Sequence, residues 1–172
     1  MTNGHTNLGE AYETLQGQLV DKNVVTVQAG YTLELDDGVL IEVLHPQTQP
    51  QPGDSLDDFA LTLRVSYGEA SFLLNSDLSA AGQQIMLENG QWPLATVLQL
   101  PQHGSLRSLD SQFLSAVQPQ VALVQADPAN RRGDPDPDIL NALGDIPLYR
   151  TDQQGAIHLW TDGQSLWTQT EK

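Results

Sequence analysis

The chain has 172 residues, of which 22 are acidic and seven are Lys or Arg, and its formal net charge is -15. This length suits one domain with a core of its own, and the absence of cysteine excludes disulfides, thiolate catalysis and cysteine-ligated zinc. The negative charge disfavours nucleic acid as a partner, since DNA-binding proteins neutralise phosphates with a basic face. We therefore expect residues 1–172 to form a single acidic domain that does not bind DNA by itself.

Targeting signals are not visible in the chain. No apolar run approaches the roughly 20 residues of a membrane-spanning helix. Residues 1–20 have neither a basic start nor a continuous apolar segment, so no secretory signal is expected. A chain without cysteine suits either side of a membrane, and the compartment therefore stays open.

The first half of the chain is typical of one helix followed by antiparallel strands. Apolar residues at three- and four-residue steps predict an amphipathic helix within residues 1–20, over residues 8–19. Strands are predicted over residues 24–27, 31–35, 39–44, 59–67 and 70–75. Asp37-Gly38 and Gly68-Glu69 predict hairpin turns, and three prolines predict a loop over residues 45–58.

From Asp77 onward the predicted helices and strands alternate, and a meander closes the chain. Asp77 or Ser79 is expected to open the first of these helices, and Asp136 to cap the last, with Pro137 at its first position. The helices are predicted over residues 77–90, 105–119 and 134–145, and the strands over residues 95–100, 121–126, 147–151, 156–161 and 165–170. This order favours a layered α/β sandwich over a purely parallel sheet.

Three strand-to-helix junctions carry residues suited to metal or phosphate chemistry. They are residues 75–77, residues 102–105 and residues 127–136. The carboxyl ends of neighbouring strands are where α/β folds gather functional groups. One Asp, one His and a further pair of Asp at these junctions could hold a hard or borderline divalent cation.

Each of these residues also has a purely structural interpretation, and the residues alone leave it open. Asp77 could cap a helix, and His103 could hydrogen-bond a neighbouring loop. Asp134, Asp136 and Asp138 could simply match the dipole of a helix start. The local positive charges, Arg131 and Arg132 with the lone Arg107, are of a kind that is usually solvated surface.

Several segments nevertheless occur in a specific order: LHP at residues 44–46, SFLLNSDL at 71–78, HGS at 103–105 and YRTDQQGAI at 149–157. In this order the chain resembles the C-terminal metallo-β-lactamase-like domain of the ComEC competence-protein family, from about Leu35 almost to its end. The resemblance implies an αββα sandwich, of which this chain would supply the C-terminal portion. It also implies a site that binds two divalent metals and hydrolyses DNA phosphodiesters.

The resemblance assigns candidate residues position by position. Asp77 matches the Asp of the family's TGD motif, and His103 matches the second His of HHGS, which makes both candidate catalytic residues. Asp134 and Asp136 fall where GHPHP has its two histidines, and they complete the set of candidate metal ligands with Asp77 and His103. The candidate substrate-binding residues are Ser105, Asn130, Arg131 and Arg132.

The chain also departs from the family pattern. Gln102 stands where the family has the first His of HHGS, and both histidines of GHPHP are aspartates. The HxHxDH motif that supplies most ligands of one metal is absent from the chain, in which His5 has no second His or Asp-His near it. Carboxylates favour Mg²⁺, Mn²⁺ or Ca²⁺ over Zn²⁺, so the remaining residues are expected to hold at most one cation, with Mn²⁺, Mg²⁺ or Zn²⁺ as the candidates and no other cofactor.

Two functional hypotheses follow. The first is a degenerate domain, weak or inactive as a hydrolase, with a structural or interaction role. The second is a metal-dependent phosphodiesterase acting on DNA and completed by residues outside this chain. A third, an acidic module unrelated to the family, is kept as an alternative. The expected partner is the remainder of a ComEC-like membrane protein or a second copy of this chain, and the location would be extracytoplasmic in the former case and cytoplasmic otherwise.

A half sandwich would leave one apolar sheet face to be covered by a partner. Trp92, Trp160 and Trp167 could mark such a face, or they could pack in the core, where tryptophan is more often found.

Overall fold

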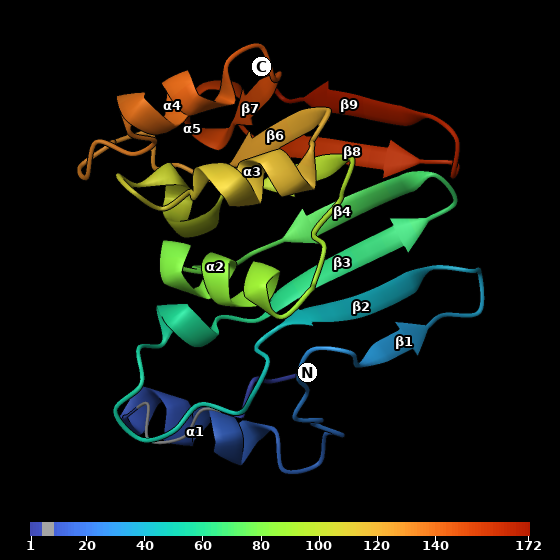
Figure 1. Ribbon diagram of the computed structural model, residues 1–172, viewed down its shortest axis with the longest axis vertical. Helices are drawn as coiled ribbons and strands as arrows, with labels where there is room; N and C mark the ends of the chain where they lie inside the picture. Colours follow the sequence, from blue (N-terminus) through green and yellow to red (C-terminus); the bar gives the residue numbers. More distant parts are fainter. Residues whose placement is uncertain (5–8) are drawn as a thin grey trace.

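A computed structural model describes residues 1–4 and 9–172, and its described part is a mixed α/β fold. A seven-stranded sheet has the order β1-β2-β3-β4-β5-β6-β7, and β8 and β9 form a separate hairpin (Figure 1). The strands are β1 Thr32–Glu34, β2 Leu40–His45, β3 Thr62–Tyr67, β4 Ala70–Leu74, β5 Val97–Gln99, β6 Val121–Val124, β7 Leu148–Arg150, β8 Ile157–Thr161 and β9 Leu166–Thr170. The helices are α1 Glu10–Gln18, α2 Ala80–Glu88, α3 Ser111–Val117, α4 Pro137–Leu143 and α5 Thr151–Gln154.

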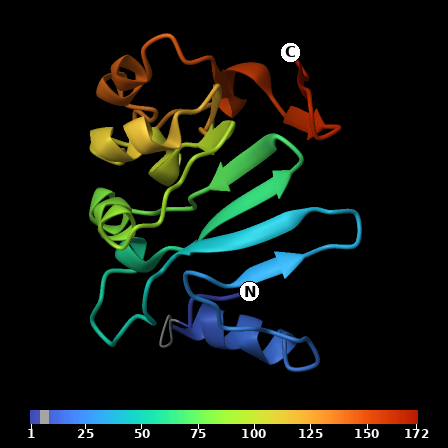
Figure 2. The ribbon, with the colours of Figure 1, turned by 45° about the vertical axis from the view of Figure 1, so that its right-hand side comes forward.

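The sheet changes its strand direction at β4. Strands β1 to β4 pair antiparallel, whereas β4 to β7 pair parallel. The parallel strands are joined by crossovers that contain α2, α3 and α4 in turn. Because such crossovers share one hand, these helices lie together on one side of the sheet (Figure 2). The α/β class expected from the order of elements is confirmed.

The core lies between the sheet and these helices. The strands contribute side chains from alternate positions, among them Leu73, Leu98 and Ala122, which are fully buried. Met86 of α2 and Phe113 of α3, also fully buried, pack into the same cluster. Burying a side chain of this size stabilises a fold by about 1.5–3 kcal/mol, so this layer holds the strand ends in place.

The other face of the sheet is also apolar, although α2, α3 and α4 do not cover it. Leu74 follows the fully buried Leu73 and is 40% exposed. Its cross-strand neighbour is Leu63, and the pair Val65 with Phe72 continues the apolar surface. We call the surface formed by Leu63, Val65, Phe72 and Leu74 the second sheet face.

The β8–β9 hairpin contacts the sheet at its tip. The backbone N–H of Glu69, in the β3–β4 turn, donates a hydrogen bond of 2.6 Å to the carbonyl oxygen of Gly163. On the hairpin, Trp160 and Trp167 are cross-strand partners with stacked rings 6.3 Å apart. Trp160 is 47% exposed, Trp167 42% and Trp92 69%, so the interpretation of these tryptophans as core residues is wrong.

Several predicted elements have different bounds in the structure. The predicted strand over residues 24–27 is wrong, because Thr26 makes only an isolated bridge with Thr2. The helix predicted over residues 105–119 begins at Ser111, capped by Asp110, because Arg107 at φ 63° keeps the preceding segment out of the helical region. The predicted first helix is observed over Glu10–Gln18, and Leu8 lies outside the described residues.

The start of α2 resolves one alternative. Ser79 caps the helix, since its side chain accepts a hydrogen bond from the backbone N–H of Gly82. Asp77 is therefore not the N-cap residue of α2. Asp136 caps α4 with Pro137 in the first turn, as predicted.

Candidate functional site

The carboxyl ends of β4, β5 and β6 meet at one edge of the sheet, and the loops that follow them contain unusual backbone conformations. Ser76, Gln102, His103 and Asn130 have φ values of 50°, 48°, 58° and 42°, in the left-handed region. This conformation is unfavourable for residues with a side chain and is concentrated at functional sites in many proteins. These loops are the three junctions that the sequence analysis selected.

His103 is held by one hydrogen bond. Its Nδ1 atom lies 2.8 Å from the backbone carbonyl oxygen of Gln125, at the end of β6. A carbonyl oxygen only accepts, so the hydrogen resides on Nδ1, and the neutral ring then carries its lone pair on Nε2. In this tautomer Nε2 is the ring nitrogen that could act as a metal ligand or a general base.

Beside His103 is a pocket of about 480 Å³. Five of the predicted site residues line it, namely His103, Asn130, Arg131, Arg132 and Asp134, and Asp127 lines it as well. The structure thus brings together one candidate metal-binding histidine, one candidate metal-binding carboxylate and three candidate substrate-binding residues.

Asp77 and Gln102 belong to a neighbouring cluster outside the lining of this pocket. The side-chain amide of Gln102 donates hydrogen bonds to Oδ2 of Asp57, at 3.0 Å, and to the backbone carbonyl oxygen of Asp77, at 3.2 Å. The side chain of Asp77 is exposed. Gln102 therefore joins the ends of β4 and β5 to the loop before β3 through its amide group.

Asp136 and Ser105 also lie outside the pocket lining. Oδ1 of Asp136 accepts a hydrogen bond of 2.8 Å from the N–H of Asp138, as expected of a helix cap. The N–H of Asp136 donates to the carbonyl oxygen of Gly104 at 2.8 Å, and the N–H of Ser105 donates to that of Gln102 at 3.0 Å. These bonds fix the loops against one another.

The four candidate metal ligands, Asp77, His103, Asp134 and Asp136, stay a prediction. Across residues 1–4 and 9–172, no group of three or more His, Asp or Glu side chains is arranged to hold a metal ion. His103 and Asp134 share a pocket, whereas Asp77 and Asp136 have the other surroundings described above.

The positive charges differ in their surroundings. Arg64 forms a bidentate pair with Glu42, with N–O distances of 2.8 and 2.9 Å. Arg150 pairs with Asp152, and its hydrogen bonds hold the pKa of that carboxyl below its usual value. For Arg131 and Arg132 no ion pair occurs within the described part of the chain. These two side chains are exposed at the pocket.

Sequence patterns did not indicate that Thr151 and Asp57 contribute to the site. Thr151 lines the pocket and binds the end of β6 twice, because its Oγ1 accepts from the N–H of Ala126 and donates to its carbonyl oxygen, at 2.9 and 3.1 Å. Asp57 precedes its partner Gln102 by 45 residues. No local pattern signals either contact.

Among the residues that the structure describes, no helix combines the length and the apolar character needed to cross a membrane.

The chain is similar to a known protein, although not to a family model. No family model matches the chain. Over 133 residues, 76% of its length, the chain is 32% identical to ComE operon protein 3 of Bacillus subtilis (strain 168). The match covers 17% of that protein, so the chain corresponds to a small part of it.

Proposed function

We propose that this chain, a homologue of part of ComE operon protein 3, is a degenerate ComEC-type metallo-β-lactamase-fold domain with a structural or interaction role in competence. In this form it has little or no hydrolytic activity of its own. The order of the LHP, HGS and YRTD segments supports the proposal, as does the mixed sheet with its site at the carboxyl ends of the strands. The chain would then be the C-terminal portion of an αββα sandwich.

The main support for this proposal comes from Gln102 and Asp136, which stand where the family has metal-binding histidines. Gln102 donates its amide hydrogens to Asp57 and Asp77, and an amide is a weak ligand for a transition metal. Asp136 uses a carboxylate oxygen to cap α4. Side chains at these positions thus stabilise loops and a helix start.

An interaction role is supported by the second sheet face. Leu63, Val65, Phe72 and Leu74 lie on the side of the sheet opposite to Leu73, which packs in the core with α2 and α3, and they form an apolar surface. Face-to-face packing of two sheets buries such surfaces in sandwich proteins. The partner would be the remainder of a ComEC-like protein, which would place the domain outside the cytoplasm, or a second copy of this chain.

A second candidate function is a metal-dependent phosphodiesterase completed by residues outside this chain. The specific observation in its favour is His103. Metal-binding histidines commonly donate their other ring N–H to a carbonyl or carboxylate, which orients the free nitrogen, and His103 donates from Nδ1 to Gln125. His103 and Asp134 would then hold one Mn²⁺, Mg²⁺ or Zn²⁺ ion, which would supply an activated water.

Metal analysis combined with a cleavage assay tests the proposal. The purified chain is analysed for bound Mn²⁺, Mg²⁺ and Zn²⁺, and each ion is then added to it with single-stranded DNA. We expect no ion uptake at micromolar concentration and no cleavage above that of a heat-denatured sample. Cleavage by the chain that is lost in both Asp77→Ala and His103→Ala, but kept in the exposed-loop control Asp145→Ala, would overturn the degenerate domain in favour of the phosphodiesterase.

A further inference from the structure

The pocket beside His103 is lined by charged and polar side chains that suit a ligand. We propose that it binds a phosphomonoester through the guanidinium groups of Arg131 and Arg132 without a metal ion. The inference rests on the proposed function, which it deepens by giving the non-hydrolytic site a ligand class.

Two arginines that are adjacent in the chain lie at the rim of the pocket. The chain has only seven Lys and Arg residues against 22 acidic ones, yet the adjacent Arg131 and Arg132 line one pocket. Arg64 and Arg150 are each paired with a carboxylate, while no ion pair forms at Arg131 or Arg132 within the described residues. Both guanidinium groups belong to the lining of the same pocket, so each of them attracts an anion that enters it.

The side chains that line the pocket include several hydrogen-bond donors. A guanidinium group presents five N–H donors in a planar fork that matches two phosphate oxygens, and it stays charged at all physiological pH values. The side-chain amide of Asn130, also in the lining, adds two further donors. A phosphate monoester has three terminal oxygens, so this donor set can satisfy all of them.

The loop that carries these residues is closed by its own hydrogen bonds. The N–H of Asn130 donates to the carbonyl oxygen of Asp127 at 2.8 Å, and the N–H of Gly133 donates to that of Asn130 at 3.2 Å. Asn130 has φ 42°, in the left-handed region. The backbone that carries the arginines is thus held in a tight turn, which lowers the backbone part of the ordering cost of binding.

Two carboxylates limit the charge that the pocket can accept. Asp127 accepts a hydrogen bond of 2.9 Å from the N–H of Ala129, so it takes part in the turn. Asp134 also lines the pocket and repels an anion. With two arginines and two aspartates, the lining suits one phosphate group better than a polyanionic strand, and the net charge of -15 repels a long nucleic acid further.

The size of the pocket agrees with a small ester. Its volume of about 480 Å³ lies within the roughly 300–1,000 Å³ typical of small-molecule sites. The space accommodates a sugar attached to the phosphate. We therefore take a nucleoside 5′-monophosphate as the probe, and free phosphate and the 5′-phosphorylated end of a short oligonucleotide as the other sources of the same group.

Calorimetry in the presence of a metal chelator tests the proposal. The full chain is titrated with inorganic phosphate, with deoxyadenosine 5′-monophosphate, with unphosphorylated deoxyadenosine, and with a short oligonucleotide with or without a 5′-phosphate. We expect saturable binding only of phosphate-terminated probes, with the nucleotide binding more tightly than inorganic phosphate. The double variant Arg131→Gln/Arg132→Gln should bind at least ten-fold more weakly, and Asp134→Asn at least two-fold more tightly.

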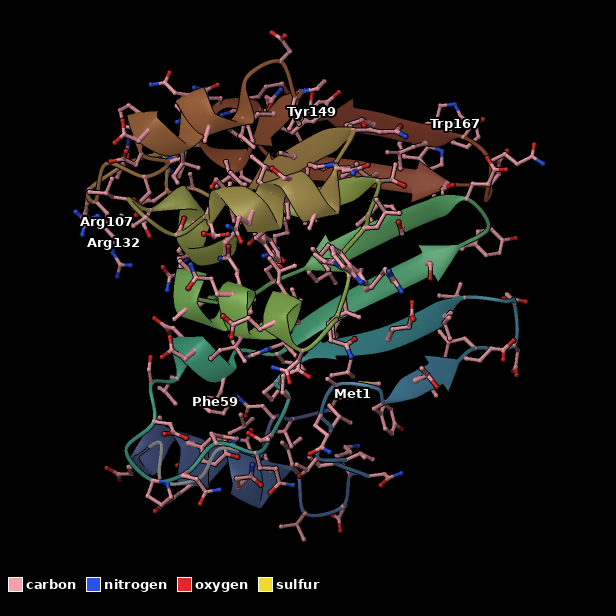
Figure 3. The ribbon with its side chains drawn as sticks, viewed as in Figure 1. Met1, Phe59, Arg107, Arg132, Tyr149 and Trp167 are labelled. Carbon is pink, nitrogen blue, oxygen red and sulfur yellow. The ribbon has the colours of Figure 1, made fainter. Side chains whose placement is uncertain are left out.

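Arg107→Gln is the matched control. Arg107 lies at the same edge of the molecule as Arg132 (Figure 3) but outside the pocket lining. Its substitution removes one positive charge, as each of the single variants Arg131→Gln and Arg132→Gln does. Binding should change less than two-fold in this control and more in either single variant.

Three results would overturn the inference: no saturable binding, equal losses in the control and in the single variants Arg131→Gln and Arg132→Gln, or binding that needs added metal. None of these depends on hydrolysis, so failure here is distinguishable from failure of the proposed function, which the cleavage assay reads.

Discussion

The Nδ1 atom of His103 and the carbonyl oxygen of Gln125 are 2.8 Å apart, and this hydrogen bond joins the carboxyl ends of β5 and β6. The two strands are parallel neighbours in the sheet. The ring is thereby held between the loop that carries it and the strand that leads into Asn130, Arg131 and Arg132. His103 thus has a structural role that is measurable separately from any role in binding.

Replacing His103 with alanine should lower the free energy of unfolding by about 1 kcal/mol, the usual value of one net hydrogen bond. Urea denaturation measures the change. The control is His158→Ala, since His158 is exposed on β8, and surface substitutions usually stay within about 0.5 kcal/mol. Equal effects of the two variants would show that the bond to Gln125 contributes no stability.

Asp136 allows a helix cap to be separated from a metal ligand. Asp136→Ala removes the oxygen that accepts from Asp138, and its expected cost is about 1 kcal/mol of unfolding free energy. Asp136→Asn keeps a capping oxygen, so we expect little loss. Thermal denaturation of both variants in a metal chelator measures this difference, and equal destabilisation by Asn and Ala would contradict the capping role.

His45 makes stability depend on pH. Burial lowers the pKa of its ring below the ordinary 6.5, although the hydrogen bond to the carbonyl oxygen of Asp58 and the charge of Asp58 act in the opposite direction. The folded state therefore keeps His45 neutral, while the unfolded state binds a proton below about pH 6.5. The stability due to this group is complete above that pH and is lost as the pH falls towards the lower folded pKa.

Urea denaturation between about pH 7.5 and pH 5.5 tests this dependence. We expect the free energy of unfolding to decrease over this range in the natural chain. His45→Gln, which has no titrating ring, should show a shallower decrease. Identical slopes for the two proteins would mean that His45 does not control stability in this range.

The contact of the hairpin with the sheet depends on a glycine. Gly68 has φ 59°, and a Cβ atom there would overlap the backbone of Gly163. Gly68→Ala should therefore break the hydrogen bond from Glu69 to Gly163 and release the tip of the β8–β9 hairpin. Hydrogen exchange should become faster in β8 and β9 but not in β5 and β6.

Gly90→Ala is the control for this effect. Gly90 also has a positive φ, of 75°, and a Cβ atom there would meet nothing within 4 Å. This variant carries the backbone strain without the steric overlap. If hydrogen exchange in β8 and β9 became faster in both variants, the cause would be backbone strain and not the overlap of residue 68 with Gly163.

The elements that were predicted well are those with local signals. Asp37-Gly38 marks the β1–β2 turn, and Asp136 with Pro137 marks the start of α4, because turn and cap chemistry involves residues close in sequence. Residues 24–27 carry the same apolar signal as a strand, but a strand also needs a partner. Thr26 has only the isolated bridge to Thr2.

The candidate site shows the same division. Chain order predicted that His103 and Asp134 lie close together, because the loops after parallel strands meet at one edge of the sheet, and both line one pocket. The hydrogen bond between Gln102 and Asp57, like the choice of Ser79 over Asp77 as helix cap, depends on tertiary contacts. The hydroxyl group of Ser79 donates to Oδ1 of Asp58, and strands β3 and β4 separate the two residues in the chain.

From the change of strand direction at β4 we expect the two halves of the sheet to form at different rates. Strands β1 to β4 are joined mainly by direct connections, whereas β5, β6 and β7 each require a crossover helix to pack before they can pair. Contacts between distant residues form more slowly, because the intervening loop must lose entropy first. Leu73 of β4 pairs with Arg64 on one side and Leu98 on the other, so we expect β4 to be the strand on which the later half of the sheet assembles.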